Sequence, residues 1–344
     1  MIAVLIIAGF VLLFIGGEAL VRGSVGIARK LGLSEFIIGV TLIGFGTSLP
    51  ELVTSLEALS QGSVGLSVGN VIGSNVANVL LVIGAAALIT PIITQSRALA
   101  RDGIFMVGVT IVFVLLIYLD LFTRVTGIAL VALLLAYLVG SILLDRRKTS
   151  AAAASPADDV EDYDHDDPIW LAIILALGGI VGVILGARFL VDGGAQAARL
   201  LGVSETVIGI SIVAIGTSLP ELATAVIAAR KGNADVALGN VLGSNVFNIL
   251  GILGISAIVY PFSVLNGGVV FNLEMPIAVE AMQYAGALVT WTDISAIILS
   301  VFLLGLFAFT GKRIARWEGA ILLAAYALYM GLRFELIPTF GLGL

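Results

Sequence analysis

The stretch GTSLPEL at residues 46–52 occurs again, unchanged, at residues 216–222. A second block, GNVIGSNVANVL at 69–80, is matched by GNVLGSNVFNIL at 239–250, with nine of twelve positions identical. The interval between the two copies is the same for both blocks. Two blocks repeated at one spacing indicate an internal duplication, and this duplication decides the predicted fold.

The composition predicts that both copies lie in a membrane. Of the 344 residues, 60% are hydrophobic and 12% are charged, and the mean hydropathy is +1.16. A soluble protein carries about 25% charged residues because its surface faces water. We therefore expect a cell-membrane protein surrounded by lipid, with no nucleic-acid partner.

The residue types also limit the chemistry. The chain has no cysteine and one histidine, His165, which excludes disulfides, thiolate metal sites and histidine-based sites within the membrane. Carboxylates, hydroxyls, amides and backbone carbonyls remain. These groups suit hard cations such as Na⁺ and Ca²⁺.

Apolar stretches long enough to cross a bilayer occur five times in each half. The expected spans are 2–21, 35–60, 66–89, 103–119 and 125–144, followed by 169–191, 204–229, 236–259, 294–311 and 317–335. The sequence thus predicts an all-α membrane protein with ten transmembrane helices in two five-helix repeats. Because five is odd, the repeats have inverted topology, and such repeats place a transport site near the midplane between them.

The predicted division is a first repeat at 1–144, an acidic linker at 145–168 and a second repeat at 169–344. Lys and Arg clusters follow the odd-numbered spans, so the positive-inside rule places the N-terminus outside and the linker in the cytoplasm. The acidic run lacks the glycine and the closing glutamate of an EF-hand loop, and we interpret it as solvated chain. The second half is longer than the first because of an insertion within 262–293, which is expected to form an external or re-entrant segment.

Glu51 and Glu221 place a carboxylate inside an expected span of each half. A charge at the bilayer centre costs on the order of 3 kcal/mol, and no basic residue lies in the apolar middle of an expected span. A cation is the simplest partner, although a proton would also neutralise the group. Two such carboxylates at the interface of the repeats would supply the −2 charge that matches Ca²⁺.

Each glutamate directly follows a proline. Proline has no N–H group and clashes with the carbonyl four residues earlier, so carbonyls at and near Thr47 and Thr217 are expected to be free for a cation. Asn78 and Asn248 follow the two glutamates at the same interval and can offer amide oxygens without adding charge.

The repeated blocks resemble the two α-repeats of the Ca²⁺/cation antiporter superfamily, specifically its sodium/calcium exchanger branch, over nearly the whole chain. The resemblance implies helices one and six that slide against a core holding the cation sites. It implies a central calcium site from Glu51, Glu221 and the carbonyls of Thr47 and Thr217, sodium sites from Ser74 with the Gly44 carbonyl and from Ser244 with the Ala214 carbonyl, and Asn78 and Asn248 facing the middle site.

The resemblance implies an electrogenic antiporter, working as a monomer, that exchanges Na⁺ for Ca²⁺ by alternating access. The two ions are its substrates, and neither a cofactor nor an enzymatic activity is expected. Asn248 replaces the aspartate of potassium-dependent relatives, which argues against potassium coupling. A proton/calcium antiporter of the same fold stays open, although GTSLPEL differs from the first motif usual in that branch.

Two other classes fit the residues less well. An intramembrane hydrolase would need an activated nucleophile, and Ser48 and Ser218 have no His or Lys base within the expected spans. A passive channel must release its ion quickly, whereas a pocket with two carboxylates would hold the ion tightly.

Overall fold

The structure is a computed structural model that describes residues 2–94, 97–152, 168–200, 214–264 and 289–333. Seven of its helices are long and apolar enough to cross a membrane, or eight if the bent pair Glu35–Thr47 and Leu49–Ser60 counts as one span. Apart from two very short strands, the regular structure of the described residues is helical. The predicted class, an all-α membrane protein, is confirmed.

The helices of the two halves repeat along the chain, with π-helical segments labelled η. The first half contains α1 (Ile2–Leu31), α2 (Glu35–Ile38), η1 (Gly39–Ile43), α3 (Gly44–Thr47), α4 (Leu49–Ser60), α5 (Val64–Ala77), η2 (Asn78–Ile83), α6 (Gly84–Ile89), β1 (Ile92–Ile93), α7 (Arg97–Leu119) and α8 (Arg124–Ala152). The second contains α9 (Ile169–Leu200), α11 (Ala214–Thr217), α12 (Leu219–Arg230), α13 (Ala234–Val246), η4 (Phe247–Ile252), α14 (Leu253–Val259), α15 (Trp291–Thr310), β2 (Arg313–Ile314) and α16 (Arg316–Arg333). Because α12 and α13 follow α4 and α5 at the interval of the repeated blocks, the sequence repeat is also a repeat of helix boundaries.

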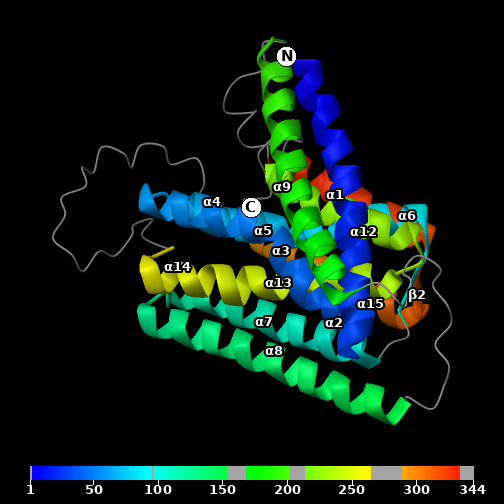
Figure 1. Ribbon diagram of the computed structural model, residues 1–344. Helices are drawn as coiled ribbons and strands as arrows, with labels where there is room; N and C mark the ends of the chain where they lie inside the picture. Colours follow the sequence, from blue (N-terminus) through cyan, green and yellow to red (C-terminus); the bar gives the residue numbers. More distant parts are fainter. Residues whose placement is uncertain (1, 95–96, 153–167, 201–213, 265–288, 334–344) are drawn as a thin grey trace.

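Helices α1 and α9 lie side by side and cross the remaining helices (Figure 1). Small residues allow their backbones to approach closely. A Cβ atom added at Gly16 would lie 2.7 Å from the backbone nitrogen of Val183, and one at Gly179 would lie closer still to that of Leu20. The contact between the two helices therefore depends on glycine.

Both helices are longer than the predicted spans 2–21 and 169–191. The helical conformation continues through charged and small residues, several of which are good helix formers. Arg22 and Arg188 consequently lie inside helices, with exposed side chains. Neither lies in the apolar middle of a predicted span, since Arg22 follows 2–21 and Arg188 lies near the end of 169–191.

Two short backbone contacts join the halves. Strands β1 and β2 pair antiparallel with Ile92 opposite Ile314, and an isolated bridge joins Phe122 to Phe262, whose rings stack 4.6 Å apart. Ile92 and Phe262 occupy the same place in the two repeats, and Phe122 and Ile314 do so once the insertion in the second half is allowed for. The two bridges are therefore equivalent, and the extra residues of the second half follow Phe262.

The last helix of each half packs against the other half. A Cβ atom at Gly127 of α8 would lie 2.6 Å from the carbonyl oxygen of Gly254 in α14. One at Gly319 of α16 would lie 2.7 Å from the carbonyl oxygen of Gly84 in α6. Gly84 and Gly254 are equivalent positions of the repeat. The two glycine contacts, like the two bridges, are therefore related to each other by the repeat.

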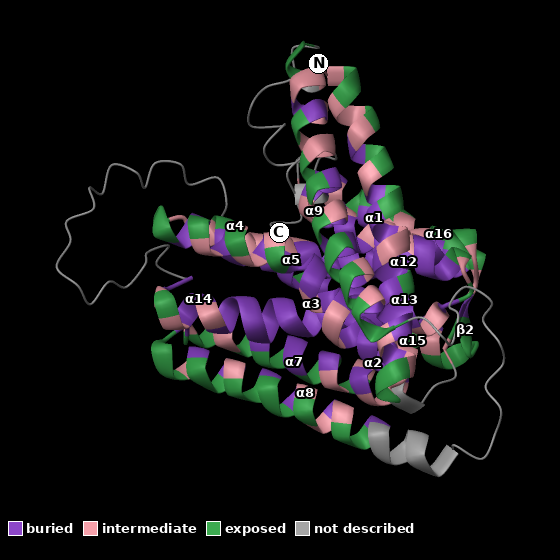
Figure 2. Ribbon diagram, in the orientation of Figure 1, coloured by how far each residue is buried: buried purple, intermediate pink, exposed green. Residues whose placement is uncertain are grey.

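The third span of each half forms the core. Buried residues account for 72% of the most apolar part of Val64–Ile89 and 89% of that of Ala234–Val259, against 28–39% in the other candidate spans. Figure 2 shows this contrast between α13 and the exposed residues of α1, α8 and α9. The repeated GNV blocks, which begin within α5 and α13, therefore lie at the centre of the protein.

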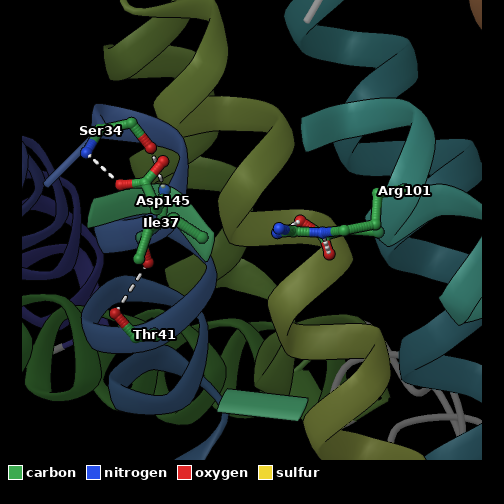
Figure 3. Close-up of polar contacts among 6 residues, drawn as sticks. Ser34, Ile37, Thr41, Arg101 and Asp145 are labelled. Carbon is green, nitrogen blue, oxygen red and sulfur yellow. Dashed lines mark hydrogen bonds and ion pairs between the residues drawn. The ribbon is translucent and has the colours of Figure 1, made fainter. Parts of the chain in front are cut away.

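Two predicted boundaries change. Helix α8 continues to Ala152, so the first residues of the linker predicted at 145–168 are helical, and 153–167 lie outside the described residues. Asp145 accepts a hydrogen bond from the backbone nitrogen of Ser34 at 2.7 Å, next to the start of α2 (Figure 3, which also shows Arg101 of α7).

Asp293, expected in the insertion, instead forms a capping box with Thr290 at the start of α15. The predicted external or re-entrant segment falls mostly on 265–288, outside the described residues.

Candidate cation site

The two glutamates lie at helix starts. The helix of each half breaks at Ser48 or Ser218, and Glu51 and Glu221 occupy the first turns of α4 and α12 directly after the breaks. In the first half the break bends the helix by 42°. Backbone N–H groups and the helix dipole at such a start favour a negative charge. The sequence predicted glutamates inside spans, and the structure adds a helix N-terminus beside each.

Both carboxylates are withdrawn from solvent, since Glu51 is 1% exposed and Glu221 is 0% exposed. The hydroxyl of Ser48 donates a hydrogen bond to Oε1 of Glu221 at 2.9 Å, so the break of one half contacts the glutamate of the other. Oε2 of each glutamate has no hydrogen-bond partner among the described residues, and no ion pair there joins a basic side chain to either. A buried acceptor without a donor is destabilising.

Asn78 and Asn248 belong to segments that pack against the opposite half. Segment η2, which begins with Asn78, contacts α12, the helix of Glu221. Segment η4, which contains Asn248, contacts α4, the helix of Glu51. Nδ2 of Asn78 donates to Oδ1 of Asn245 at 3.1 Å, and Nδ2 of Asn248 donates to Oγ of Ser74 at 3.0 Å. Oδ1 of both is buried without a partner in the described part of the chain.

Nine buried side-chain oxygens of the described residues have no hydrogen-bond partner; five are hydroxyls, and the other four are these two carboxylate and two amide oxygens. Buried polar atoms are nearly always paired, so four exceptions on residues repeated at one spacing require an explanation. A hard cation provides one, because Ca²⁺ takes carboxylate and amide oxygens as ligands. No cluster of three or more His, Cys, Asp or Glu side chains occurs in the part of the chain that the structure describes. A metal site here would therefore combine two carboxylates with neutral oxygens.

The expected carbonyl ligands lie directly before the helix breaks. Thr47 is the last residue of α3 and Thr217 the last of α11. The hydroxyl of Thr47 donates to the carbonyl oxygen of Ile43 at 3.0 Å. Each threonine is therefore held within a short helix that ends next to the glutamate.

The serines and small residues pair differently from the resemblance. The hydroxyl of Ser244 donates to the carbonyl oxygen of Gly44 at 3.0 Å, whereas the resemblance pairs Gly44 with Ser74. The hydroxyl of Ser74 donates to Val71 at 3.2 Å, and Ala214 begins α11. The physical reason is the close approach of α13 to Gly44, where an added Cβ would lie 2.9 Å from the backbone nitrogen of Ser244.

The sequence analysis missed Asn70 and Asn240. Nδ2 of Asn70 donates to the backbone carbonyl of Glu51 at 3.1 Å, and Nδ2 of Asn240 donates to that of Glu221 at 3.3 Å. These bonds hold the start of α4 to α5 and the start of α12 to α13. The repeat could have identified them, since each is the second residue of a repeated block, after its first glycine.

A family model matches most of the chain. The family model described as "Sodium/calcium exchanger protein" matches residues 1–143 and 171–335. The chain belongs to the sodium/calcium exchanger family. It is similar to the sodium/calcium exchanger MaX1 of Methanosarcina acetivorans, at 33% identity over 366 residues that cover 96% of this chain and 97% of MaX1. An uncharacterized membrane protein of Methanocaldococcus jannaschii is 34% identical over 321 residues, covering 93% and 94% of the two chains.

A solved structure shares the fold. The sodium-calcium exchanger NCX_Mj, soaked with zero Na⁺ and Ca²⁺, has a TM-score of 0.76 and 30% identity, and the match covers 96% of this exchanger and 98% of that chain. Members of the family are membrane exchangers rather than enzymes, and Na⁺ and Ca²⁺ are the family's substrates. The exchanger described here is therefore a multi-pass membrane antiporter of cations.

Proposed function

We propose that this exchanger carries Ca²⁺ in exchange for Na⁺ by alternating access, with one Ca²⁺ bound between Glu51 and Glu221. The observation that carries the proposal is the set of four buried oxygens without donors, two of which belong to these carboxylates. A bound Ca²⁺ gives all four a partner, and the −2 charge of the carboxylates matches that of the ion.

The remaining ligands are those that the resemblance to sodium/calcium exchangers implies. The carbonyls of Thr47 and Thr217 complete the Ca²⁺ site. Sodium ions use the hydroxyls of Ser74 and Ser244 and the carbonyls of Gly44 and Ala214, while Asn78 and Asn248 face the middle of the site. Hydroxyls and carbonyls at interrupted helices are suited to Na⁺ because they offer oxygen without adding charge.

We further propose ten membrane spans in two inverted repeats, within a monomer. Two bridges and two glycine contacts related by the repeat support this arrangement. Lys and Arg residues after the odd-numbered spans support an external N-terminus and a cytoplasmic linker.

A second candidate is proton/calcium exchange at the same site. The burial of both carboxylates favours it, because protons on Glu51 and Glu221 would also neutralise them. In that case Ca²⁺ flux follows a pH gradient. The sodium candidate predicts that flux follows a Na⁺ gradient at constant pH.

The decisive experiment is ⁴⁵Ca²⁺ uptake into proteoliposomes that contain the purified protein. Vesicles loaded with Na⁺ are diluted into Na⁺-free buffer, and matched vesicles carry N-methylglucamine inside and a pH gradient. We expect rapid uptake only in the Na⁺-loaded vesicles. Uptake driven by the pH gradient alone would establish the proton candidate, and uptake under neither gradient would reject both.

A further inference from the structure

Met106 of α7 is connected to the site through an asparagine. Nδ2 of Asn245 donates a hydrogen bond to the sulfur of Met106 at 3.5 Å, and Oδ1 of Asn245 accepts one from Nδ2 of Asn78 at 3.1 Å. All three residues are buried, with 2% of Met106 and 1% of each asparagine exposed. A chain of contacts therefore runs from α7 through α13 to the amide at the start of η2.

The chemistry of sulfur sets the direction of these bonds. A thioether can accept a hydrogen bond but cannot donate one, so Asn245 must turn its NH₂ group toward Met106 and its oxygen toward Asn78. That oxygen is also only an acceptor, so Asn78 must turn its own NH₂ group toward it. The oxygen of Asn78 is the atom left over, and it is buried without a partner in the described structure.

The second half orients its amide in another way. Nδ2 of Asn248 donates to Ser74, and the hydroxyl of Ser74 donates to the carbonyl of Val71, so a backbone carbonyl is the final acceptor. Asn75, the repeat equivalent of Asn245, donates to the same carbonyl at 2.7 Å. The position equivalent to Met106, counted from Asp102 and Asp293, is the buried Ile297. A side-chain sulfur therefore has this role in one half only.

We propose that Met106 and Asn245 are positioning residues that make Asn78 present its oxygen, rather than its NH₂ group, to Ca²⁺. This inference rests on the proposed function of the site. If Asn78 turned over, the positive end of its amide dipole would face the cation, and Ca²⁺ would lose one neutral ligand.

Met106→Leu tests this role directly. Leucine keeps most of the apolar volume of methionine but removes the acceptor that faces Asn245. If Asn78 then presents its oxygen for roughly a tenth to a third of the time, the apparent affinity for Ca²⁺ falls about three- to tenfold, because apparent Kd is intrinsic Kd divided by the competent fraction. Asn245→Leu, which removes the intermediate amide, is expected to have an effect of the same size.

The measurement is the initial rate of ⁴⁵Ca²⁺ uptake against Ca²⁺ concentration, for the full chain in proteoliposomes. Met330→Leu is the matched control, because Met330 packs against the apolar core from α16. We expect a higher half-saturating Ca²⁺ concentration in Met106→Leu and Asn245→Leu, with maximal rates within about twofold of wild type and with no such increase in Met330→Leu.

Two results would overturn the proposal. One is an equal half-saturating concentration in Met106→Leu, Met330→Leu and wild type. The other is a lower maximal rate at an unchanged half-saturating concentration, which is the effect of partial misfolding rather than of a turned amide. If Met106→Leu does not fold, Asn245→Leu decides by the same criteria. A wild-type protein that carries no Ca²⁺ under a Na⁺ or a pH gradient would instead reject the proposed function.

Discussion

Replacing Glu221 with glutamine should remove one of the two buried negative charges with little change in shape. The side chain is fully buried, and its Oε1 accepts a hydrogen bond from Ser48 at 2.9 Å. The Oε1 atom of a glutamine can accept the same bond, so the surrounding structure should persist. Glu51→Gln is the equivalent change in the other half.

The loss of affinity can be bracketed. At a Ca²⁺–oxygen distance of about 2.4 Å, a unit negative charge attracts the ion by about 14 kcal/mol at an effective dielectric constant of about 20. Desolvation of the ion and the carboxylate offsets most of this attraction. Removing one partner of a buried ion pair costs about 3–5 kcal/mol, so Ca²⁺ binding should weaken on the order of 10²- to 10⁴-fold.

Calorimetric titration of the purified proteins with Ca²⁺ measures this loss, and thermal unfolding in Ca²⁺-free buffer verifies that the variants fold. Ca²⁺ should raise the melting temperature of wild type but not of Glu51→Gln or Glu221→Gln, since a ligand stabilises only a protein that binds it. Glu57→Gln is the matched control, because Glu57 is exposed on the same helix as Glu51. Affinities of both site variants within about threefold of the control, less than about 1 kcal/mol, would refute the assignment of the site.

Three further predictions concern charge movement, the linker and the contact between α1 and α9. With two ionised carboxylates, the site is neutral with one Ca²⁺ and carries +1 with three Na⁺, the number that the family resemblance implies, so 100 mV should shift the exchange equilibrium by about 2.3 kcal/mol. Exchange that does not respond to voltage in valinomycin-clamped vesicles would contradict this count. Deleting 153–166 should leave ⁴⁵Ca²⁺ exchange largely intact, whereas loss of transport in a deletion that still folds would indicate regulation by the acidic run. Gly179→Ala should destabilise the protein by about 1–3 kcal/mol through overpacking, because the added Cβ meets the backbone of Leu20. Gly178→Ala is the control and should not destabilise it, because nothing lies within 4 Å of the Cβ added there. Equal melting temperatures of the two variants would show that the helices separate freely.

Several properties of this exchanger could be predicted from the sequence because they are properties of short segments. Apolar runs identify spans whatever their neighbours are, and two repeated blocks at one spacing show a duplication. Glu51 and Glu221 stand out by the same reasoning, since a carboxylate in an apolar span needs a partner wherever the span lies. The resemblance to sodium/calcium exchangers was confirmed because it rests on those blocks.

The tertiary structure alone decided which oxygens are left free. The bonds of Ser48 to Glu221, of Asn78 to Asn245 and of Ser244 to Gly44 each join one half of the chain to the other. Sequence spacing contains no information on how two halves are placed against each other, so it could not show that Gly44 meets the serine of the opposite half. The sulfur of Met106 shows the same limit. In the sequence, Met106 is an ordinary apolar residue of a helix. It has a polar role only because packing places its sulfur against the amide of Asn245. Since that sulfur accepts a hydrogen bond but cannot donate one, it sets the orientation of the Asn245 and Asn78 amides.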